Sequence, residues 1–156
     1  MWLFFSILLI IAITFFVMVN SNENFKLSGK FKHLKKNKFQ HEIHDGAFYQ
    51  GSFIEIIGPK LDSSVEKVVT AFLVRDFNSK DQKCAVMVLV NDLKLGYLSD
   101  EDAIKFMRLL KLNNLKEESG INVQALIYGD WGTDDIDGNF QINLNISKDL
   151  SDSDII

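Results

Sequence analysis

The sequence predicts a mainly β (α+β) protein: a small closed or half-closed antiparallel β-barrel with one helix, preceded by a single N-terminal transmembrane helix. Three observations predict this class. The chain begins with a long apolar run, several short β-rich segments joined by turn residues follow, and one segment near residue 100 has a helix cap and helical spacing. Strands joined mainly by hairpins favour an antiparallel barrel. A chain of 156 residues has room for one such domain of ordinary size.

The apolar run at the N-terminus, Trp2–Val19, contains no charged residue. As a helix rising about 1.5 Å per residue it would span roughly 27 Å, close to the hydrocarbon thickness of a bilayer. A cleaved signal peptide would have basic residues before the run and a small-residue cleavage site after it, and the sequence shows neither. A core helix that is apolar on every side would need a larger protein around it. We therefore predict an uncleaved transmembrane helix over residues 1–19.

Residues 20–45 are predicted to form a lysine-rich linker. Its first part, residues 20–40, contains six lysines and one acid, Glu23; the lysines are Lys26, Lys30, Lys32, Lys35, Lys36 and Lys38. Positive residues close to a membrane helix stay in the cytoplasm. We therefore predict a single-pass protein of the inner (cytoplasmic) membrane, with its N-terminus outside and its domain in the cytoplasm. Membrane lipid is an expected partner, through residues 2–19 and through this linker, because each lysine near anionic headgroups contributes about 1 kcal/mol.

The formal net charge of −4 combines two unlike parts. Residues 1–39 carry six lysines and one glutamate, a charge of +5, whereas residues 40–156 carry eleven basic and twenty acidic side chains, a charge of −9. A body this acidic disfavours broad electrostatic binding to phosphate backbones, so any nucleic-acid site must be small and local. The single Cys excludes an internal disulfide framework and a multi-Cys zinc site.

The first half of the body is predicted to form strands. Ser52–Gly58 is β-rich and ends at Gly-Pro, and Val65–Arg75 is a longer run of β-branched and apolar residues. After the polar loop Asp76–Lys83, the unbroken apolar segment Cys84–Val90 predicts a buried strand. An Asn-Asp turn then leads into a further strand over Leu93–Leu98.

A helix is predicted to follow. Ser99 and Asp102 resemble a capping box, with acidic residues in the first turn. Apolar residues follow at helical spacing: Ala103, Phe106, Met107 and Leu110.

Two more strands close the predicted barrel. They are Ile121–Gly129 and the strictly alternating segment Asn139–Ile146, with a hairpin turn at Asp137-Gly138 between them. The barrel domain is thus expected over residues 46–148, and residues 149–156 are expected to be a frayed acidic tail.

The order of these features resembles the HIRAN family over about residues 50–148. The similarity rests on Arg75-Asp76, Ala85-Val86-x-Val88, Gly96-Tyr97-Leu98 before the helix, and Tyr128-Gly129 with Asn139-Phe140. The family's two loop prolines are replaced here by Phe77 and Lys80. HIRAN domains are found on DNA-remodelling helicases and as free-standing bacterial proteins. The resemblance implies an OB-like or SH3-like barrel that binds single-stranded DNA and captures DNA 3′ ends.

Carried over position by position, the resemblance implies roles for Arg75, Asp76 and Tyr97, and for Asp81 after a one-residue slip in the loop. Lys80 and Lys83 flank Asp81 and complete the expected nucleic-acid site. The Tyr97 ring would stack on a base, which contributes about 1–3 kcal/mol. An aspartate of the loop would accept a hydrogen bond from a terminal hydroxyl, and the lysines would neutralise phosphates. The alternative is that Tyr97 is an ordinary barrel aromatic and that the loop Asp76–Lys83 is a solvated connection.

No metal site, cofactor or catalytic centre is expected. His41, Glu42, His44 and Asp45 are ligand-type residues, but no second pair accompanies them, and a linker end is the better interpretation. The acidic residues Asp130, Asp134, Asp135 and Asp137 lack the alternating ligands and closing Glu of a calcium loop. The P-loop, GxSxG and HExxH motifs are absent, so we expect a protein that is not an enzyme.

Two functional hypotheses follow. The first is a membrane-anchored HIRAN-like module that binds single-stranded DNA or DNA ends. The second is a membrane-tethered protein-interaction domain that kept the barrel and lost the nucleic-acid pocket. The acidic charge of residues 40–156 favours the protein-interaction domain, whereas the DNA binding implied by the resemblance to the HIRAN family favours the nucleic-acid module.

Overall fold

The structure is a computed structural model that describes residues 25–35, 38–80, 84–132 and 138–156. The predicted transmembrane helix, Asp81, Lys83 and the predicted turn at Asp137 lie outside these residues. Within the described part of the chain, every helix is too short or too polar to cross a bilayer.

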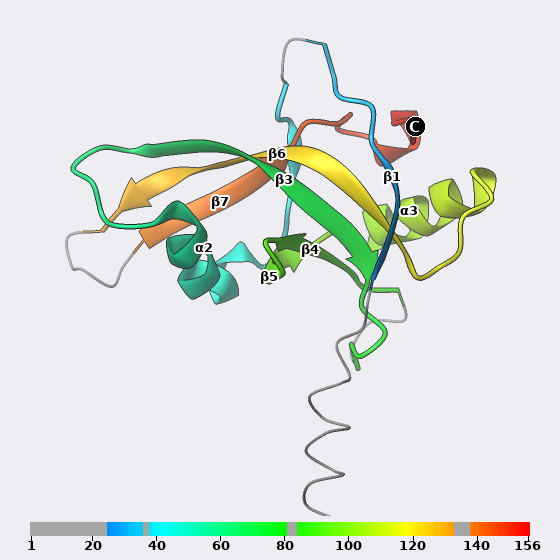
Figure 1. Cartoon of the computed structure of the whole chain (residues 1–156), viewed down its shortest axis with the longest axis horizontal. Coiled ribbons are helices and arrows are strands. Elements are labelled where there is room, and N and C mark those ends of the chain that lie inside the picture. The colour runs from blue at the N-terminus through cyan, green and yellow to red at the C-terminus, as the bar shows by residue number, and fades with distance from the viewer. Residues whose placement is uncertain (1–24, 36–37, 81–83, 133–137) are drawn as a thin grey trace, which may run out of the picture.

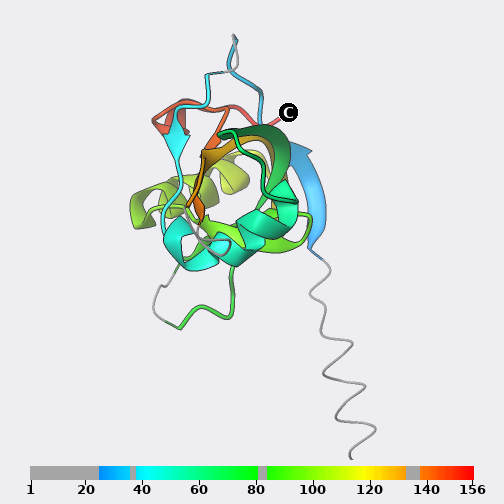
Figure 2. The ribbon, with the colours of Figure 1, turned by 90° about the vertical axis from the view of Figure 1, so that its left-hand side faces the viewer.

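The fold is mainly β, as predicted: one sheet curls into a half-barrel (Figures 1 and 2). The strand order in the sheet is β2-β7-β6-β3-β4-β5. Strand β1 also pairs with β6 but is not part of this linear order. Neighbouring strands are antiparallel except for β1 and β6, which are parallel. The strands are β1 (Lys26–Lys30), β2 (His41–Glu42), β3 (Val65–Arg75), β4 (Val86–Val90), β5 (Leu93–Tyr97), β6 (Ser119–Trp131) and β7 (Gly138–Leu144). The helices are the 3-10 turn η1 (Gly46–Tyr49), α2 (Gln50–Ile57), α3 (Asp100–Leu112) and the 3-10 turn η2 (Leu150–Asp152).

The strands predicted from Val65 onward and the predicted helix are all confirmed within a few residues. Strand β4 is buried on both faces, which explains its unbroken apolar sequence. Helix α3 begins where the cap predicts, because the Ser99 hydroxyl accepts a hydrogen bond from the Asp102 backbone N–H at 3.1 Å. Its apolar side chains Ala103, Phe106 and Leu110 pack into the core.

The segment Ser52–Gly58 is a helix rather than the predicted strand, so the domain has two α-helices instead of one. Helix α2 places Phe53 and Ile56, one helical turn apart, in the core. It ends at Gly58, which has a φ of 94° and donates its backbone N–H to Ile54 O at 2.9 Å. Helices α2 and α3 lie at opposite ends of the curled sheet (Figure 1).

The predicted linker also needs correction, because much of it belongs to the folded domain. Strand β1 pairs with the start of β6, and β2 pairs with the end of β7. Between them Phe31 is fully buried in the core. A buried phenylalanine contributes about 1.5–3 kcal/mol, which offsets part of the cost of ordering this lysine-rich segment.

The acidic tail is packed rather than frayed. Leu150 is fully buried, and Ile155 forms a bridge to Phe31. Ile156 and Lys30 exchange two backbone hydrogen bonds, of 2.8 and 3.1 Å. The tail therefore covers the edge of β1 that β6 leaves free, which satisfies backbone groups that an open edge would expose.

Candidate functional site

The residues that the sequence singled out around Tyr97 are positioned by a β-bulge in β5. Leu89 pairs with Lys94, but the next pair is Val88 with Gly96, so one extra residue is accommodated in β5. In a regular strand, residues three apart point to opposite faces. The bulge reverses this alternation, and Lys94 and Tyr97 therefore meet on the same, outer face of the sheet.

Asp76, Lys94 and Tyr97 form a hydrogen-bonded triad on that face. The Tyr97 hydroxyl donates to Asp76 Oδ2 at 2.7 Å, and Lys94 Nζ lies 3.1 Å from the same oxygen. Lys94 Nζ also lies 2.6 Å from the Tyr97 hydroxyl oxygen. The Asn78 backbone N–H donates to the other carboxylate oxygen of Asp76 at 3.0 Å. The side chain of Asp76 is only 9% exposed, so these contacts replace most of its hydration.

The pKa values of the triad follow from this geometry. Burial disfavours ionised Asp76, but the hydrogen bonds from Tyr97, Lys94 and the Asn78 N–H outweigh burial and lower its pKa. Burial disfavours charged Lys94, but its contacts with Tyr97 and Asp76 raise its pKa overall. Burial and the hydrogen bond to Asp76 raise the pKa of Tyr97 to about 12, against the opposing effect of Lys94. The triad therefore holds a carboxylate, an ammonium and a neutral phenol, which is an arrangement suited to bracing the sheet and not to general base chemistry.

We expect the Tyr97 phenol to ionise near pH 12 in the folded protein. The physical reasons are the burial of the phenol and the hydrogen bond that it donates to the carboxylate of Asp76. The measurement is the pH dependence of the ¹³Cζ chemical shift of tyrosine, with Tyr97→Phe used to assign the signal. A Tyr97 resonance that titrates near pH 10, the usual value for tyrosine, would contradict the triad.

Of the predicted nucleic-acid residues that the structure describes, Asp76 and Tyr97 lie together. Arg75, the last residue of β3, points to the other face and forms an ion pair with Glu117. Lys80 is exposed in the loop after β3. Asp81 and Lys83 lie outside the described residues. The sequence missed Lys94, because only the bulge brings it to Tyr97.

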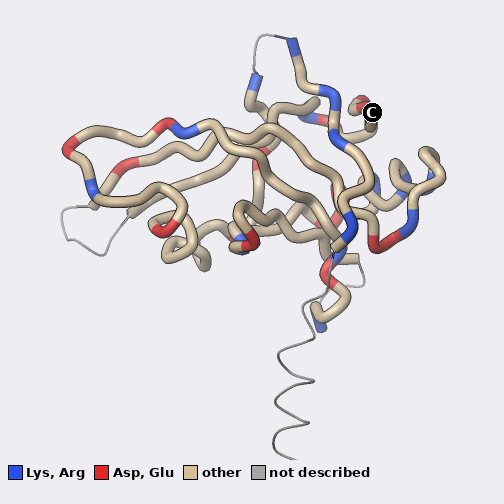
Figure 3. The backbone as a smooth tube through the Cα atoms, viewed as in Figure 1, with Lys and Arg blue, Asp and Glu red and all other residues tan. Residues whose placement is uncertain are grey.

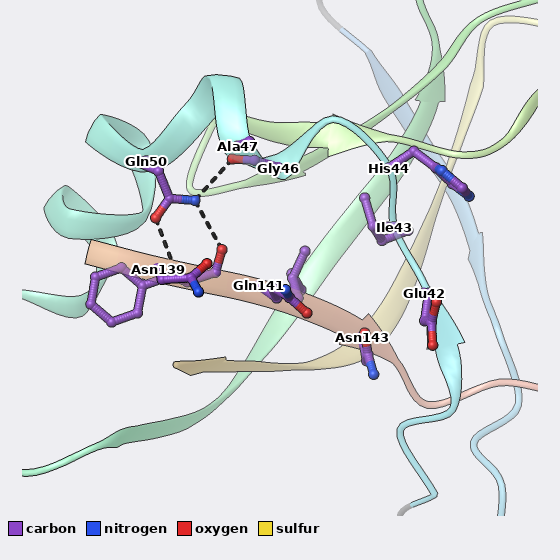
Figure 4. Close-up of a pocket in the computed structure, with 11 residues that line it drawn as sticks. Glu42, Ile43, His44, Gly46, Ala47, Gln50, Asn139, Gln141 and Asn143 are labelled. Atoms are coloured by element: carbon purple, nitrogen blue, oxygen red, sulfur yellow. Dashed lines mark hydrogen bonds between the residues drawn. The ribbon is translucent and has the colours of Figure 1, made fainter. Parts of the chain in front are cut away.

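A polar pocket of about 270 Å³ lies between β7 and the segment from Glu42 to Gln50 (Figure 4). It is lined by Glu42, Ile43, His44, Gly46, Ala47, Gln50, Asn139, Phe140, Gln141, Ile142 and Asn143. Figure 4 shows the amide side chains of Asn139, Gln141 and Asn143 in a row along β7. Ala47 is exposed at the wall of the pocket.

The pocket exists because the chain leaves β7 to close the half-barrel. Glu42 pairs with Asn143 on β7, but His44 exchanges backbone hydrogen bonds of 2.9 and 3.0 Å with Tyr97 on β5. The chain returns to β7 at Gln50, whose side-chain amide donates to Phe140 O and accepts from the Phe140 N–H, each at 2.9 Å. Gln50 therefore bonds to the strand edge as a neighbouring strand would.

The chemistry of this pocket differs from that of a phosphate site. Its polar side chains are amides, one histidine and one carboxylate, and its lining includes neither Lys nor Arg. Amides both donate and accept hydrogen bonds, which suits a neutral ligand that does the same. Among the described residues, no group of three or more His, Cys, Asp and Glu is placed to hold a metal ion.

The sequence predicts a linker end at His41–Asp45 and a strand over Asn139–Ile146, but not a pocket between them. The signal available in the sequence was the alternation of Asn139, Gln141 and Asn143, which places three amides on one face of a strand. The role of Gln50 left no comparable signal.

Comparisons with family models, with curated proteins and with solved structures found no match to this chain.

Proposed function

We propose that this chain is a membrane-tethered, non-catalytic protein-interaction domain that receives an extended polypeptide segment in the pocket between β7 and residues 42–50. The observation that carries the proposal is the amide-rich lining of that pocket, which contains neither Lys nor Arg, beside a strand edge. An extended peptide carries one N–H donor and one carbonyl acceptor per residue, which is what the pocket's amides can pair with. The transmembrane helix over residues 1–19 and the cytoplasmic placement of the domain are part of the proposal.

An exposed aromatic residue beside the pocket supports a protein ligand. Phe48 is 83% exposed and follows Ala47, which lines the pocket. Aromatic side chains that become buried on binding are frequent anchors of protein interfaces. Phe48 would pack against an apolar side chain of the bound segment.

We infer further that the domain is a HIRAN-like, OB-like barrel that has lost the nucleic-acid site of that family. The Gly-Tyr step at Gly96-Tyr97 and the hairpin of β3 and β4 support the likeness. The ion pairs of the expected DNA-binding residues oppose a DNA ligand, because Lys94 is bonded to Asp76, and Arg75 to Glu117. Binding a phosphate group would require breaking these ion pairs, which costs energy. Residues 40–156 carry a formal charge of −9, so their overall electrostatic attraction for phosphate does not compensate for that cost.

Filling the pocket is the direct test. Full-length protein in lipid nanodiscs would be used to select binders from a displayed library of random peptides, and a selected peptide would be labelled for fluorescence anisotropy. We expect Ala47→Trp to weaken its binding by about tenfold or more, which corresponds to about 1.4 kcal/mol. The added indole would occupy the space that the peptide needs, without removing an existing contact.

Gly51→Trp is the matched control. Gly51 is exposed in the first turn of α2, a Cβ there meets no atom within 4 Å, and it does not line the pocket. This variant should bind the peptide as the parent protein does. Failure to select any peptide, or a peptide that binds Ala47→Trp as well as the parent, would refute the proposed function.

A further inference from the structure

Two amide side chains in the wall of the pocket are oriented by hydrogen bonds to their neighbours. The Tyr128 hydroxyl donates to Gln141 Oε1 at 2.9 Å, and Asn143 Nδ2 donates to the Phe39 carbonyl oxygen at 3.3 Å. An amide has an acceptor at one end and two donors at the other, so a bond at one end decides which end is left for a ligand. Gln141 therefore presents its NH2 group, and Asn143 presents its carbonyl oxygen Oδ1.

The two groups that remain are open to a ligand. Among the described residues, neither Gln141 Nε2 nor Asn143 Oδ1 has a hydrogen-bond partner. Gln141 is exposed, Asn143 is half-buried, and both line the pocket. Gln50 differs from them, because its side-chain nitrogen donates to both Gly46 O and Phe140 O. Gln50 thus holds the walls of the pocket together, whereas Gln141 and Asn143 face what enters it.

Gln141 and Asn143 form a donor–acceptor pair of defined spacing. They are alternate residues of β7, so their side chains project from the same face of the strand, with backbone positions about 7 Å apart. Figure 4 shows them next to each other along β7. An extended polypeptide presents carbonyl and N–H groups in alternation along each of its edges. The pair therefore matches the main chain of an extended segment.

The charges around this pair favour a neutral ligand group. Strand β7 contains no Lys, Arg, Asp or Glu, so it is drawn in tan throughout in Figure 3. Asn143 pairs in register with Glu42, whose exposed carboxylate would repel an anionic ligand, as would Asn143 Oδ1. The NH2 group of Gln141 cannot accept a hydrogen bond from an ammonium or guanidinium group. A peptide group is neutral and carries both the acceptor and the donor that the pair requires.

We propose that Gln141 and Asn143 determine the specificity of the pocket by binding the main chain of the guest segment. Gln141 Nε2 donates to a backbone carbonyl of that segment, and Asn143 Oδ1 accepts from one of its backbone N–H groups. Tyr128 is a positioning residue, because it acts on the guest only through Gln141. The inference rests on the proposed function, since it requires an extended segment in this pocket. The guest is then recognised with little regard to its side chains at this place, but the residue that donates must keep its N–H, which excludes proline.

The first test removes the donor of Gln141 from the full-length protein in nanodiscs and measures the anisotropy of the selected peptide. Gln141→Glu has nearly the same size and still accepts from Tyr128, but it has lost both N–H groups. We expect it to weaken peptide binding by about tenfold or more. Gln124→Glu is the matched control, because Gln124 Oε1 accepts from Asn145 Nδ2 at 2.6 Å on β6 and does not line the pocket. This control should bind within about twofold of the parent protein.

Tyr128→Phe tests the positioning role. Without the hydroxyl the Gln141 amide can rotate, so we expect peptide binding to weaken by about threefold. In the Gln141→Glu background, where the donor is already absent, the same substitution should change binding by less than about twofold. Equal effects of Tyr128→Phe in the two backgrounds would show that Tyr128 does not act through Gln141.

The selected peptide supplies the second test. Each of its backbone N–H groups is replaced in turn by N-methyl, and each of its side chains in turn by alanine. At one residue, N-methylation should weaken binding by about tenfold or more, whereas alanine at the same residue should change it by less than about threefold.

The outcomes separate this inference from the proposed function. Unchanged affinity in Gln141→Glu, or for every N-methylated peptide, with Ala47→Trp still blocking the peptide, would overturn the main-chain recognition alone. Failure to select any peptide, or binding that Ala47→Trp does not affect, would overturn the proposed function and this inference with it.

Discussion

Replacing Gly96 by valine is expected to destabilise the folded domain by about 3 kcal/mol or more. A Cβ at this position would lie 2.8 Å from Ile43 Cγ2 and would overlap the carbonyl oxygen of His44. The φ of Gly96 is 156°, in a region that residues with a side chain rarely adopt. The segment that closes the half-barrel would therefore be pushed off β5. The measurement is urea unfolding of the full chain in nanodiscs, followed by circular dichroism.

Gly51→Ala is the matched control for Gly96. Gly51 lies in α2, and a Cβ there meets open space. Alanine in a helix is favoured over glycine by about 0.5–1 kcal/mol, so this variant should be slightly more stable than the parent. A Gly96→Val variant with an unchanged unfolding midpoint would mean that His44 does not pair with Tyr97 as described.

Replacing Asp76 by alanine is expected to cost about 2 kcal/mol at neutral pH. The substitution leaves the Lys94 ammonium and the Tyr97 hydroxyl, both half-buried, without their shared acceptor. Asp62→Ala, on an exposed loop, should change the stability by less than about 0.5 kcal/mol. In a double-mutant cycle, Asp76→Ala and Tyr97→Phe should show a coupling of about 1 kcal/mol. Purely additive effects would show that the triad does not act as a unit.

The contribution of Asp76 should also depend on pH. Because the folded state lowers the pKa of Asp76, the folded state stabilises its ionised form. This stabilisation is fully present above about pH 4, the ordinary pKa of aspartate, and is lost as the pH falls through the lower pKa of the folded state. The difference in unfolding free energy between the parent and Asp76→Ala should therefore shrink in acid. A constant difference from pH 7 down to pH 2 would exclude a role for the ionised carboxylate.

The sequence predicted the structure correctly where one local pattern determines it. Val86–Val90 is buried on both faces, and a strand in that environment is apolar at every position, so its continuous apolar run predicts it directly. Helix α3 carries its own start signal at Ser99 and its own apolar face. In both elements, the pattern of the segment and its environment in the fold agree.

The secondary structure predicted from the sequence was wrong where tertiary contacts determine it. Helix α2 has only eight residues, no side-chain cap and two isoleucines near its end, so its local preference is close to that of a strand. The core packing of Phe53 and Ile56 selects the helix. Strand β1 consists largely of polar residues and is held by pairing with β6 and with the C-terminal tail, which no local pattern reveals.

The candidate site likewise contains residues that the sequence could predict and residues that it could not. Tyr97 and Asp76 could be selected from the order of the sequence features around them, and in the structure they lie together. Lys94 could not be added to them, because its face depends on a bulge that shifts the register by one residue. The pocket could not be predicted either, since it lies where two distant segments, Glu42–Gln50 and β7, separate.

Hydrogen exchange of the full chain in nanodiscs, with a selected peptide or with a 3′-hydroxyl oligothymidine, tests the central claim most directly. The peptide is expected to slow exchange in residues 42–50 and in β7, and the oligonucleotide is expected to change exchange nowhere. Ala47→Trp should abolish the effect of the peptide. Salt-sensitive protection by the oligonucleotide around Tyr97 and Lys80, with residues 42–50 unchanged by any peptide, would contradict the proposed function and favour a nucleic-acid ligand.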